Sequence, residues 1–287
     1  MTTLSSATKD VVFGPGSGQP CAIIGERINP TGKSKLQEAL RAGDLTLVQN
    51  SARRQVEGGA HILDVNVGTP GVNEVEMLAM AVKAVMDVTD LPICIDTANP
   101  DALAAALAVY KGKALVNSVT GEEHSLGRVL PLVKQYGAAI VGMCQDDTGI
   151  PCTVEERFAI ARRIVEACAS LGIPKDDVVI DCACLSAGAD PTAPQVTLGT
   201  VKMVTDVLGV STVLGASNVS FGLPGRKTVN GVFLAMAIGA GLTAAIVDPT
   251  LPEIVETMTI ADMLAGRDDF ATRYLAYFRA AHPAQPK

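Results

Sequence analysis

The chain has 287 residues, enough for one large domain or two modest ones. Its formal net charge of −7 argues against nucleic acid as a partner, because phosphate binding favours a basic surface. Apolar residues make up 48% and aromatic residues only 3%, so the core must consist mainly of Ala, Val, Leu and Ile.

Eight short apolar runs with strand character recur along the chain. They are residues 22–25, 62–65, 92–95, 114–116, 138–143, 178–180, 212–214 and 245–247. Segments with helical periodicity separate them, at residues 46–60, 73–90, 99–112, 122–136, 153–172, 194–208, 227–240 and 251–264. Asn99 is expected to cap one of these helices, and Thr153 with Glu156 has the spacing of a capping box.

Strand and helix alternate eight times at the spacing of a parallel α/β fold. This pattern predicts a single (β/α)₈ TIM-barrel domain over about residues 20–265, followed by a C-terminal helical extension over about 266–287. An open doubly wound sheet is the rival fold. It usually carries a Gly-rich phosphate loop after its first strand, and neither GxGxxG nor GxxxxGK[ST] occurs in the sequence.

Targeting and membrane signals are weak. The N-terminus lacks a basic start followed by an apolar core, so no signal peptide is expected. The uncharged run at 231–247 contains Gly239 and Gly241, which favours a helix end, a turn and a strand over a membrane span. The seven cysteines are an odd number and lie mostly in apolar runs, which favours reduced thiols in a cytoplasmic protein.

Every predicted strand ends in an acid or an amide. The residues are Glu26 and Asn29, Asp64 and Asn66, Asp96 and Asn99, Asn117, Gln145 with Asp146 and Asp147, Asp181, Asn218, and Asp248. In a parallel barrel these ends share one face, where the loops after the strands form the active site. Helix capping is the structural alternative at each single position, most of all at Asn99, but it explains the whole set less well.

A floor of carboxylates and amides with few cations favours a neutral ring that presents several N–H donors and a few acceptors. A 2-amino-4-oxopyrimidine edge has this pattern, because a carboxylate accepts from N3–H and the 2-amino group together. Pterins carry this edge. A divalent metal bound by carboxylates is the alternative from chemistry alone.

The strand-end motifs together resemble those of the pterin-binding methyltransferases. This family includes methyltetrahydrofolate:corrinoid protein methyltransferases and the folate domain of cobalamin-dependent methionine synthase, and more distantly dihydropteroate synthase. The similarity covers about residues 20–265. Its motifs are IIGERINPTG (23–32), GGAHILDVNVG (58–68), ICIDTAN (93–99), ALVNSVTGE (114–122), DDTGIP (146–151), VVIDCACL (178–185), VLGASNVSFGLPGR (213–226) and FLAMAIGAGLTAAIVDP (233–249).

The resemblance implies roles for individual residues. Asp96, Asn117 and Asp181 are expected to bind the pterin, and Asn218 is expected near N5 as the catalytic amide. Arg226 and Lys227 are expected either to meet the folate tail or the partner protein, or to lie in solvent. The residues expected to contact or surround the ring are Glu26, Asn29, Asp64, Asn66, Asp147 and Arg226.

The implied reaction is methyl transfer between N5 of tetrahydrofolate and the cobalt of a corrinoid, in either direction. The departing amine of 5-methyltetrahydrofolate is a poor leaving group, so positive charge must develop on N5 by protonation or by a hydrogen bond that strengthens in the transition state. An amide such as Asn218 supplies such a bond in the family, and a buried carboxylate tunes the proton affinity of the ring.

The corrinoid is expected on a separate protein, because none of the three histidines, His61, His124 and His282, lies in the DxHxxG motif of corrinoid-carrying domains. His61 is expected to be structural. The pairs Cys182/Cys184 and Cys144/Cys152 are weak metal signals and are expected to be buried strand or loop thiols, so no metal is expected to bind this chain. The resemblance also implies a homodimer.

Three other functions compete with methyl transfer. Dihydropteroate synthase must bind a pyrophosphate and usually shows a Ser-Arg-Lys motif after strand seven, whereas here the cations are displaced to Arg226 and Lys227. A non-catalytic pterin-binding module is disfavoured by the presence of Asn218. A metal-dependent barrel aldolase or hydrolase would lose activity in the presence of chelators.

Overall fold

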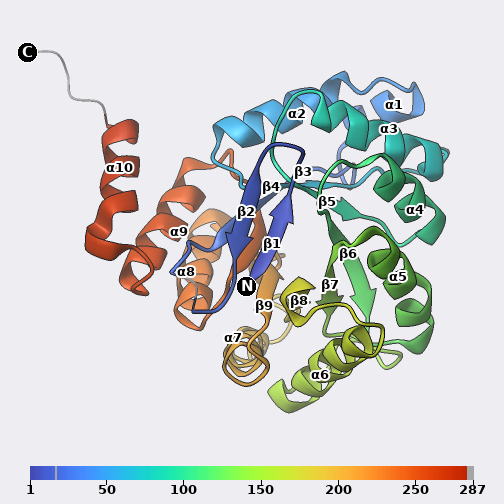
Figure 1. Cartoon of the computed structure of the whole chain (residues 1–287). Coiled ribbons are helices and arrows are strands. Elements are labelled where there is room, and N and C mark those ends of the chain that lie inside the picture. Colours follow the sequence, from blue (N-terminus) through green and yellow to red (C-terminus); the bar gives the residue numbers. More distant parts are fainter. Residues whose placement is uncertain (17, 283–287) are drawn as a thin grey trace, which may run out of the picture.

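The molecule is built around a closed barrel of eight parallel strands (Figure 1). The computed structural model describes residues 1–16 and 18–282. The strands follow the order β10-β3-β4-β5-β6-β7-β8-β9 around the barrel, which confirms the predicted TIM barrel. They are β3 (Ala22–Ile28), β4 (Ile62–Val65), β5 (Ile93–Asp96), β6 (Leu115–Thr120), β7 (Ala139–Met143), β8 (Val178–Asp181), β9 (Ser211–Gly215) and β10 (Ala244–Val247).

A ring of helices surrounds this barrel. They are α2 (Thr46–Glu57), α3 (Glu74–Met86), α4 (Pro100–Val109), α5 (Glu123–Tyr136), α6 (Val154–Ser170), α7 (Ala193–Met203), α8 (Arg226–Gly239) and α9 (Pro252–Leu264). The two predicted caps are confirmed, since Asn99 accepts from the backbone of Asp101 and Ala102, and Thr153 accepts from Glu156 N. An additional short helix, α1 (Ser34–Arg41), precedes α2 and was not predicted.

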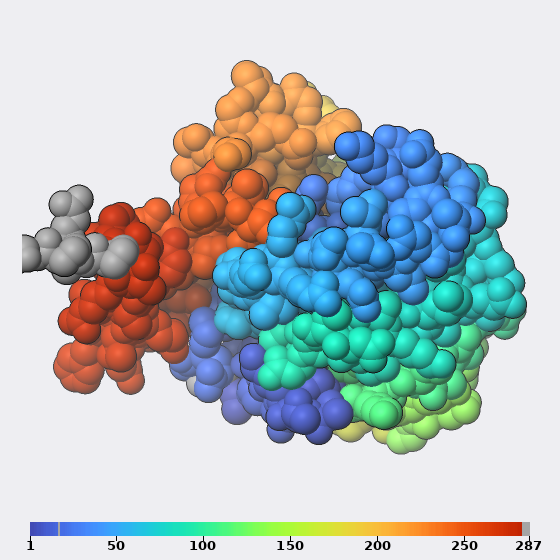
Figure 2. Space-filling view, turned by 90° about the horizontal axis from the view of Figure 1, so that it is seen from above, coloured from blue at the N-terminus to red at the C-terminus, as the bar shows by residue number. Residues whose placement is uncertain are grey.

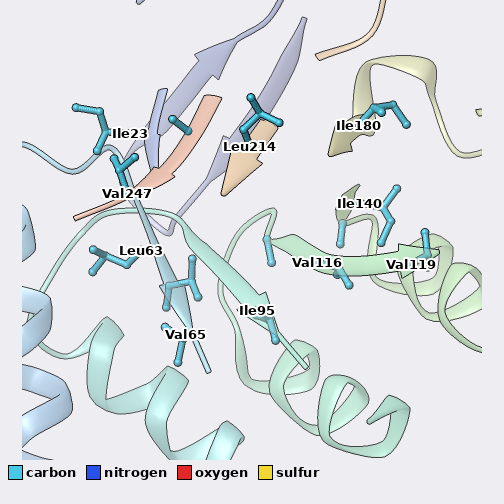
Figure 3. Close-up of a cluster of buried hydrophobic side chains, with 14 of the residues drawn as sticks. Ile23, Leu63, Val65, Ile95, Val116, Val119, Ile140, Ile180, Leu214 and Val247 are labelled. Carbon is cyan, nitrogen blue, oxygen red and sulfur yellow. The ribbon is translucent and has the colours of Figure 1, made fainter. Parts of the chain in front are cut away.

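The strands bury apolar side chains on both faces, as expected for a parallel sheet covered by helices. Figure 3 shows the outward-facing set, which includes Ile23, Leu63, Ile95 and Ile180 and belongs to the core between the strands and the helices. The inward-facing residues form a second cluster inside the barrel. These are Ala22, Ile24, Ile62, Cys94, Leu115, Ala139, Val141, Val179, Val213 and Ala244.

The N-terminal end of the barrel is closed by an antiparallel hairpin that was not predicted. The hairpin consists of β1 (Thr2–Ser5) and β2 (Asp10–Phe13) and crosses the barrel opening (Figure 1). Its Leu4 and Phe13 are fully buried in the cluster inside the barrel. Thr2 Oγ1 also lies 2.7 Å from Ser211 Oγ at the start of β9. This end therefore serves packing and leaves the opposite end for a ligand.

A final helix, α10 (Thr272–Ala281), packs beside α9 at one edge of the molecule (Figures 1 and 2). It lies within the predicted C-terminal extension, of which residues 283–287 fall outside the described residues. The run 231–247 forms the end of α8, a turn and β10, as predicted. In the described part of the chain, no helix has the length and apolar character needed to cross a membrane.

Candidate functional site

The polar strand ends occupy inward-facing positions at the C-terminal end of the barrel. Because side chains alternate along a strand, the residue two places after an interior residue also points inward. Asp64, Asp96 and Asp181 follow the interior residues Ile62, Cys94 and Val179 by two places, and Asn117 likewise follows Leu115. The strands thus carry an apolar layer and, directly above it, a layer of acids and amides.

Two predicted strand ends need correction. The sequence ended one strand at Gly25, before Glu26, and another at Val116, before Asn117. In the structure β3 continues to Ile28 and β6 continues to Thr120, so both polar residues lie within strands. The register with the neighbouring strand shifts between Gly25 and Ile28 and again between Asn117 and Val119. Both strands continue past their apolar runs because backbone pairing with the neighbouring strand resumes after the register shift.

Hydrogen bonds join the predicted residues of three neighbouring strands. Asn117 Nδ2 donates to Asp64 Oδ1 at 3.3 Å, and Asn66 Nδ2 donates to Asp96 Oδ2 at 3.0 Å. The amide oxygen of Asn66 accepts from Gly68 N at 2.8 Å. The Asn117 NH₂ group uses one of its two donor hydrogens on Asp64, and its carbonyl oxygen is turned away from that bond and can accept from a ligand.

The carboxyl groups of this network resist ionisation. Burial, and then the neighbouring Asp96 carboxylate, raise the pKa of Asp64 to about 8. Burial also raises the pKa of Asp96, although the hydrogen bond from Asn66 opposes the shift. Asp64 is 3% exposed and Asp96 is half-buried, so Asp96 is the member of the pair that a ligand reaches first.

Asp181 forms a third acidic position at the end of β8. Its Oδ1 accepts from Ala183 N at 2.9 Å, within a turn in which Ala183 has a φ of 58°. Burial raises the pKa of Asp181 to about 6, opposed by the hydrogen bond from Ala183 and by the positive charge of Arg157. This carboxyl group therefore gains or loses a proton close to neutral pH.

Asn218 lies in the short 3₁₀ turn η3 (Ala216–Ser220) that follows β9. Its side chain is exposed and makes no hydrogen bond to the described residues, whereas its backbone oxygen accepts from Phe221 N at 3.1 Å. A Cβ atom at Gly215 would lie 3.3 Å from Asn218 Nδ2, so the amide lies close above the end of β9. The amide is thus held at the barrel mouth with its donors free for a ligand.

Glu26, on β3, lies close to Asp248, which follows the neighbouring strand β10. Burial and then Asp248 raise the pKa of Glu26. Asp248 itself pairs with Arg27, whose Nε lies 3.2 Å from Asp248 Oδ2. These residues, with Ser217 and Arg226, line a hollow of about 220 Å³. Another hollow, of about 280 Å³, adjoins Asp96 and Asn117.

The two cations predicted for a ligand tail have protein partners. Arg226 donates from Nε to Ser220 Oγ and from Nη2 to Ser217 O, both at 3.0 Å, so it braces the turn that carries Asn218. Lys227 Nζ lies 2.5 Å from Glu253 Oε1 on α9. Both residues line the hollow beside Glu26, and the charged group of each has a protein partner.

Two other predicted residues are not joined to the network. Asn29 Oδ1 accepts from Thr31 N at 2.9 Å and so stabilises its own turn. Asp147 is exposed in the loop after β7 and makes no hydrogen bond to the other predicted site residues. The structure thus brings Asp64, Asn66, Asp96 and Asn117 together and leaves Asn29 and Asp147 apart from them.

The cysteines and His61 are structural in character. All seven cysteines are free, and Cys152 is exposed, which corrects the prediction that the four weak metal candidates are buried. His61 Nδ1 accepts from Ile23 N at 2.9 Å at the start of β3. Over residues 1–16 and 18–282, no group of three or more His, Cys, Asp or Glu residues is placed to hold a metal ion.

Arg157 was not predicted as a site residue, but it is 1% exposed and lies against the turn that follows Asp181. Charged residues on helices are usually exposed, so the residue type alone suggested a solvated position. A signal was nevertheless present, because Arg157 shares the buried helical face of Ile160, Ala161 and Ile164.

Comparisons with known proteins identify the family of this chain. The model of a family described as pterin-binding enzymes matches residues 25–248. A methylcorrinoid:tetrahydrofolate methyltransferase from Eubacterium limosum is 29% identical over 273 residues, covering 92% of this chain and 99% of the relative. A methionine synthase from Mycobacterium leprae is 32% identical over 238 residues, which are 78% of this chain but only 20% of that protein.

Solved structures of dihydropteroate synthases share the fold. One from Yersinia pestis, with a pterin–sulfa conjugate, has a TM-score of 0.69 at 18% identity and covers 92% of this chain and 98% of its own. One from Xanthomonas albilineans, in complex with 7,8-dihydropteroate, also has a TM-score of 0.69, at 19% identity. At this level of identity the likeness concerns the barrel architecture alone.

Proposed function

The chain belongs to the family of pterin-binding enzymes, and on this premise we propose that it transfers a methyl group between tetrahydrofolate and a corrinoid. The methyl group moves between N5 of tetrahydrofolate and the cobalt of a corrinoid carried by a separate protein. Methyl-Co(III) and tetrahydrofolate give Co(I), 5-methyltetrahydrofolate and the proton released from N5, or the reverse. The observation that carries the proposal is the similarity to a methylcorrinoid:tetrahydrofolate methyltransferase over nearly the full length of both chains.

The acids and amides at the barrel mouth fit a pterin. Asp96 and Asp181 are half-buried and offer carboxylate oxygens to the N–H groups of the ring. Asn117, turned by its bond to Asp64, presents a carbonyl oxygen to a further ring donor. Burial raises the pKa of both acids, and a ligand that donates hydrogen bonds to their oxygens would stabilise the ionised forms and oppose this rise.

Asn218 is the group proposed to act at N5. Its amide NH₂ donates a hydrogen bond that gains strength as negative charge would otherwise develop on the departing nitrogen. Because Arg226 and Ser220 brace its turn, the amide stays in place while the ring binds and leaves. The corrinoid of the partner supplies the cobalt that gives or accepts the methyl group, and Asn218 lies on the exposed side of the site where such a partner docks.

Dihydropteroate synthase activity is the alternative with the same fold. It requires cations for a pyrophosphate, and the cations nearest to the Asn218 turn already bind protein groups, Arg226 with Ser217 and Ser220 and Lys227 with Glu253. The acidic floor adds unfavourable electrostatics for a pyrophosphate. These contacts favour methyl transfer.

We further propose that two copies associate through the apolar surface around α10. Phe270 is 97% exposed and Leu264 is 78% exposed, and Leu275 and Phe278 on α10 are also exposed. These four exposed apolar side chains fall within the short segment 264–278, and such a gathering favours a protein partner. Light scattering should show a dimer, and Phe270→Ser should weaken it. The control Leu171→Ser changes an exposed residue at the C-terminal end of α6 and should leave the dimer intact. A monomeric parent protein would contradict this proposal.

The activity is tested by anaerobic absorbance spectroscopy of the protein with tetrahydrofolate and methylcob(III)alamin, free or bound to corrinoid proteins of the same source. The expected result is the appearance of the Co(I) spectrum, with 5-methyltetrahydrofolate formed in equal amount. Absence of Co(I) with every corrinoid form, together with no binding of tetrahydrofolate by calorimetry, would overturn the proposal.

A further inference from the structure

A buried arginine lies directly behind the proposed pterin-binding acid at the end of β8. Arg157, in the first turn of α6, is among the largest fully buried side chains. It forms no ion pair with any carboxylate of residues 1–16 and 18–282. A buried cation without a counter-ion is costly, and a helix N-terminus adds an unfavourable dipole. Packing alone therefore gives no reason for a charge here.

The guanidinium group instead binds backbone carbonyls of the loops around the site. Its Nη1 donates to Ala183 O at 2.6 Å and to Cys182 O at 3.0 Å, and its Nε donates to Pro151 O at 2.8 Å. Thr197 on α7 supports the same turn, since its Oγ1 accepts from Arg157 at 3.3 Å and lies 3.0 Å from Ala183 O.

The turn held in this way controls the orientation of Asp181. Ala183 has a left-handed backbone, which residues other than glycine rarely adopt without support. Its carbonyl is fixed by Arg157 and Thr197, and its N–H donates to Asp181 Oδ1 at 2.9 Å. One unbroken series of contacts thus leads from the guanidinium group to the carboxylate.

We propose that Arg157 is a positioning residue for Asp181, which it holds toward the barrel mouth through the Cys182–Ala183 turn and supplies with a compensating positive charge. The proposal deepens the function given above and rests on it, because it concerns the acid assigned there to the pterin. Asp181 itself touches the ring, whereas Arg157 acts through the turn.

The charge on Arg157 also bears on the titration of Asp181. Arg157 on α6 is the cation that acts on Asp181. The other titratable groups around Asp181 are the thiols of Cys144, Cys182 and Cys184. Burial raises the pKa of all three thiols, so they stay neutral around pH 6. Removal of the guanidinium charge should therefore raise the pKa of Asp181 with little response from these neighbours.

The test follows Asp181 itself by carbon-13 NMR of the carboxyl group in the free protein, with Asp181→Asn to assign the signal. Arg157→Met should raise its titration midpoint by about one pH unit, and Arg157→Lys, which keeps a charge, should remain closer to the parent protein. An unchanged midpoint in Arg157→Met would overturn the proposal. Because no ligand is present, this result is independent of whether the protein binds tetrahydrofolate.

A milder pair of variants covers the case in which Arg157→Met fails to fold. Thr197→Val removes the hydroxyl at Ala183 O and should raise the Asp181 midpoint slightly. Thr200→Val is its matched control, because Thr200 is also fully buried on α7. Both hydroxyls lie within hydrogen-bond distance of the carbonyl four residues earlier in the helix, but that of Thr197 also reaches Ala183 O. Equal midpoints in the two variants would contradict the proposal.

The same variants, titrated with tetrahydrofolate by calorimetry, connect the turn to function. Thr197→Val should weaken binding at pH 6 more than at pH 8, since a higher Asp181 pKa leaves less of the ionised acceptor at the lower pH. If the variants shift the Asp181 midpoint but the parent protein binds no tetrahydrofolate, the positioning role of Arg157 stands and the proposed function is refuted.

Discussion

The two ends of the barrel are built from the same strands but differ in chemistry. At the N-terminal end, the inward-facing residues are apolar and the hairpin residues Leu4 and Phe13 pack onto them. Two places further along the strands, the inward-facing residues are Asp64, Asp96 and Asn117, and no hairpin covers them among the described residues. The apolar layer inside the barrel thus stabilises the fold, and the polar layer next to it provides the groups for ligand binding.

The largest effect on stability is expected from a substitution at the N-terminal end of the barrel, which the hairpin closes. Phe13→Ala removes a fully buried aromatic ring and should lower the free energy of unfolding by about 3 kcal/mol. Urea denaturation measures the loss, with Val12→Ala, from the half-buried face of the same strand, as the control. Tetrahydrofolate affinity of the folded variant should be unchanged; a loss of binding would show that the two ends are not separable.

At the open end, Asn218→Ala should lower the rate of methyl transfer by about 100-fold, the size expected when one transition-state hydrogen bond is lost. Tetrahydrofolate affinity should change little, because the ring is held by other groups. Stopped-flow absorbance of Co(I) and calorimetry measure the two quantities, with the exposed Asn50→Ala on α2 as the control. If binding disappears instead, Asn218 anchors the ring and the assigned role is wrong.

Asp96→Ala should show the opposite pattern. A hydrogen bond to a charged group contributes about 1.5–3 kcal/mol, so tetrahydrofolate binding should weaken by about 10- to 100-fold. The rate at saturating tetrahydrofolate should fall much less. Calorimetry and steady-state kinetics separate the two, and normal affinity in this variant would remove Asp96 from the pterin site.

The last prediction concerns the direction in which stability changes with pH. The pKa of Asp64 is raised to about 8 in the folded protein, against about 4 in the unfolded chain, so the folded state holds its proton more tightly between these values. Asp64 therefore makes the protein less stable as the pH rises from about 4 to about 8. Asp64→Asn should flatten this slope in thermal unfolding, whereas the exposed Asp90→Asn should not; equal slopes would contradict the burial argument.

Sequence patterns predicted the C-terminal end of the barrel, which carries the site, better than the N-terminal end, which the hairpin closes. Polar residues such as Asp96 and Asp181 at the ends of apolar runs are conspicuous, and parallel strands bring their ends to one face. The hairpin residues Leu4 and Phe13 stand in short, mixed segments whose burial depends on contacts with strands far along the chain. Local periodicity cannot reveal such long-range packing.

The details of the site also depended on tertiary structure. The sequence suggested that Asn29 and Asn66 are equivalent, but only Asn66 reaches across to Asp96 on the next strand. Arg226 was placed near the site from its motif, whereas its contacts with Ser217 and Ser220 follow from the path of the turn. Side-chain direction and loop path decide these contacts, and neither is encoded in residue spacing.

Methyl transfer by this protein is tested most directly by following the methyl group itself. Methylcob(III)alamin labelled with carbon-13 in its methyl group, free or on a corrinoid protein, is incubated anaerobically with tetrahydrofolate and the protein, and the label is located by NMR. The predicted result is one labelled methyl on N5 of tetrahydrofolate for each Co(I) formed, at a much lower rate with Asn218→Ala. A protein that binds tetrahydrofolate while the label stays on cobalt with every corrinoid carrier would contradict it.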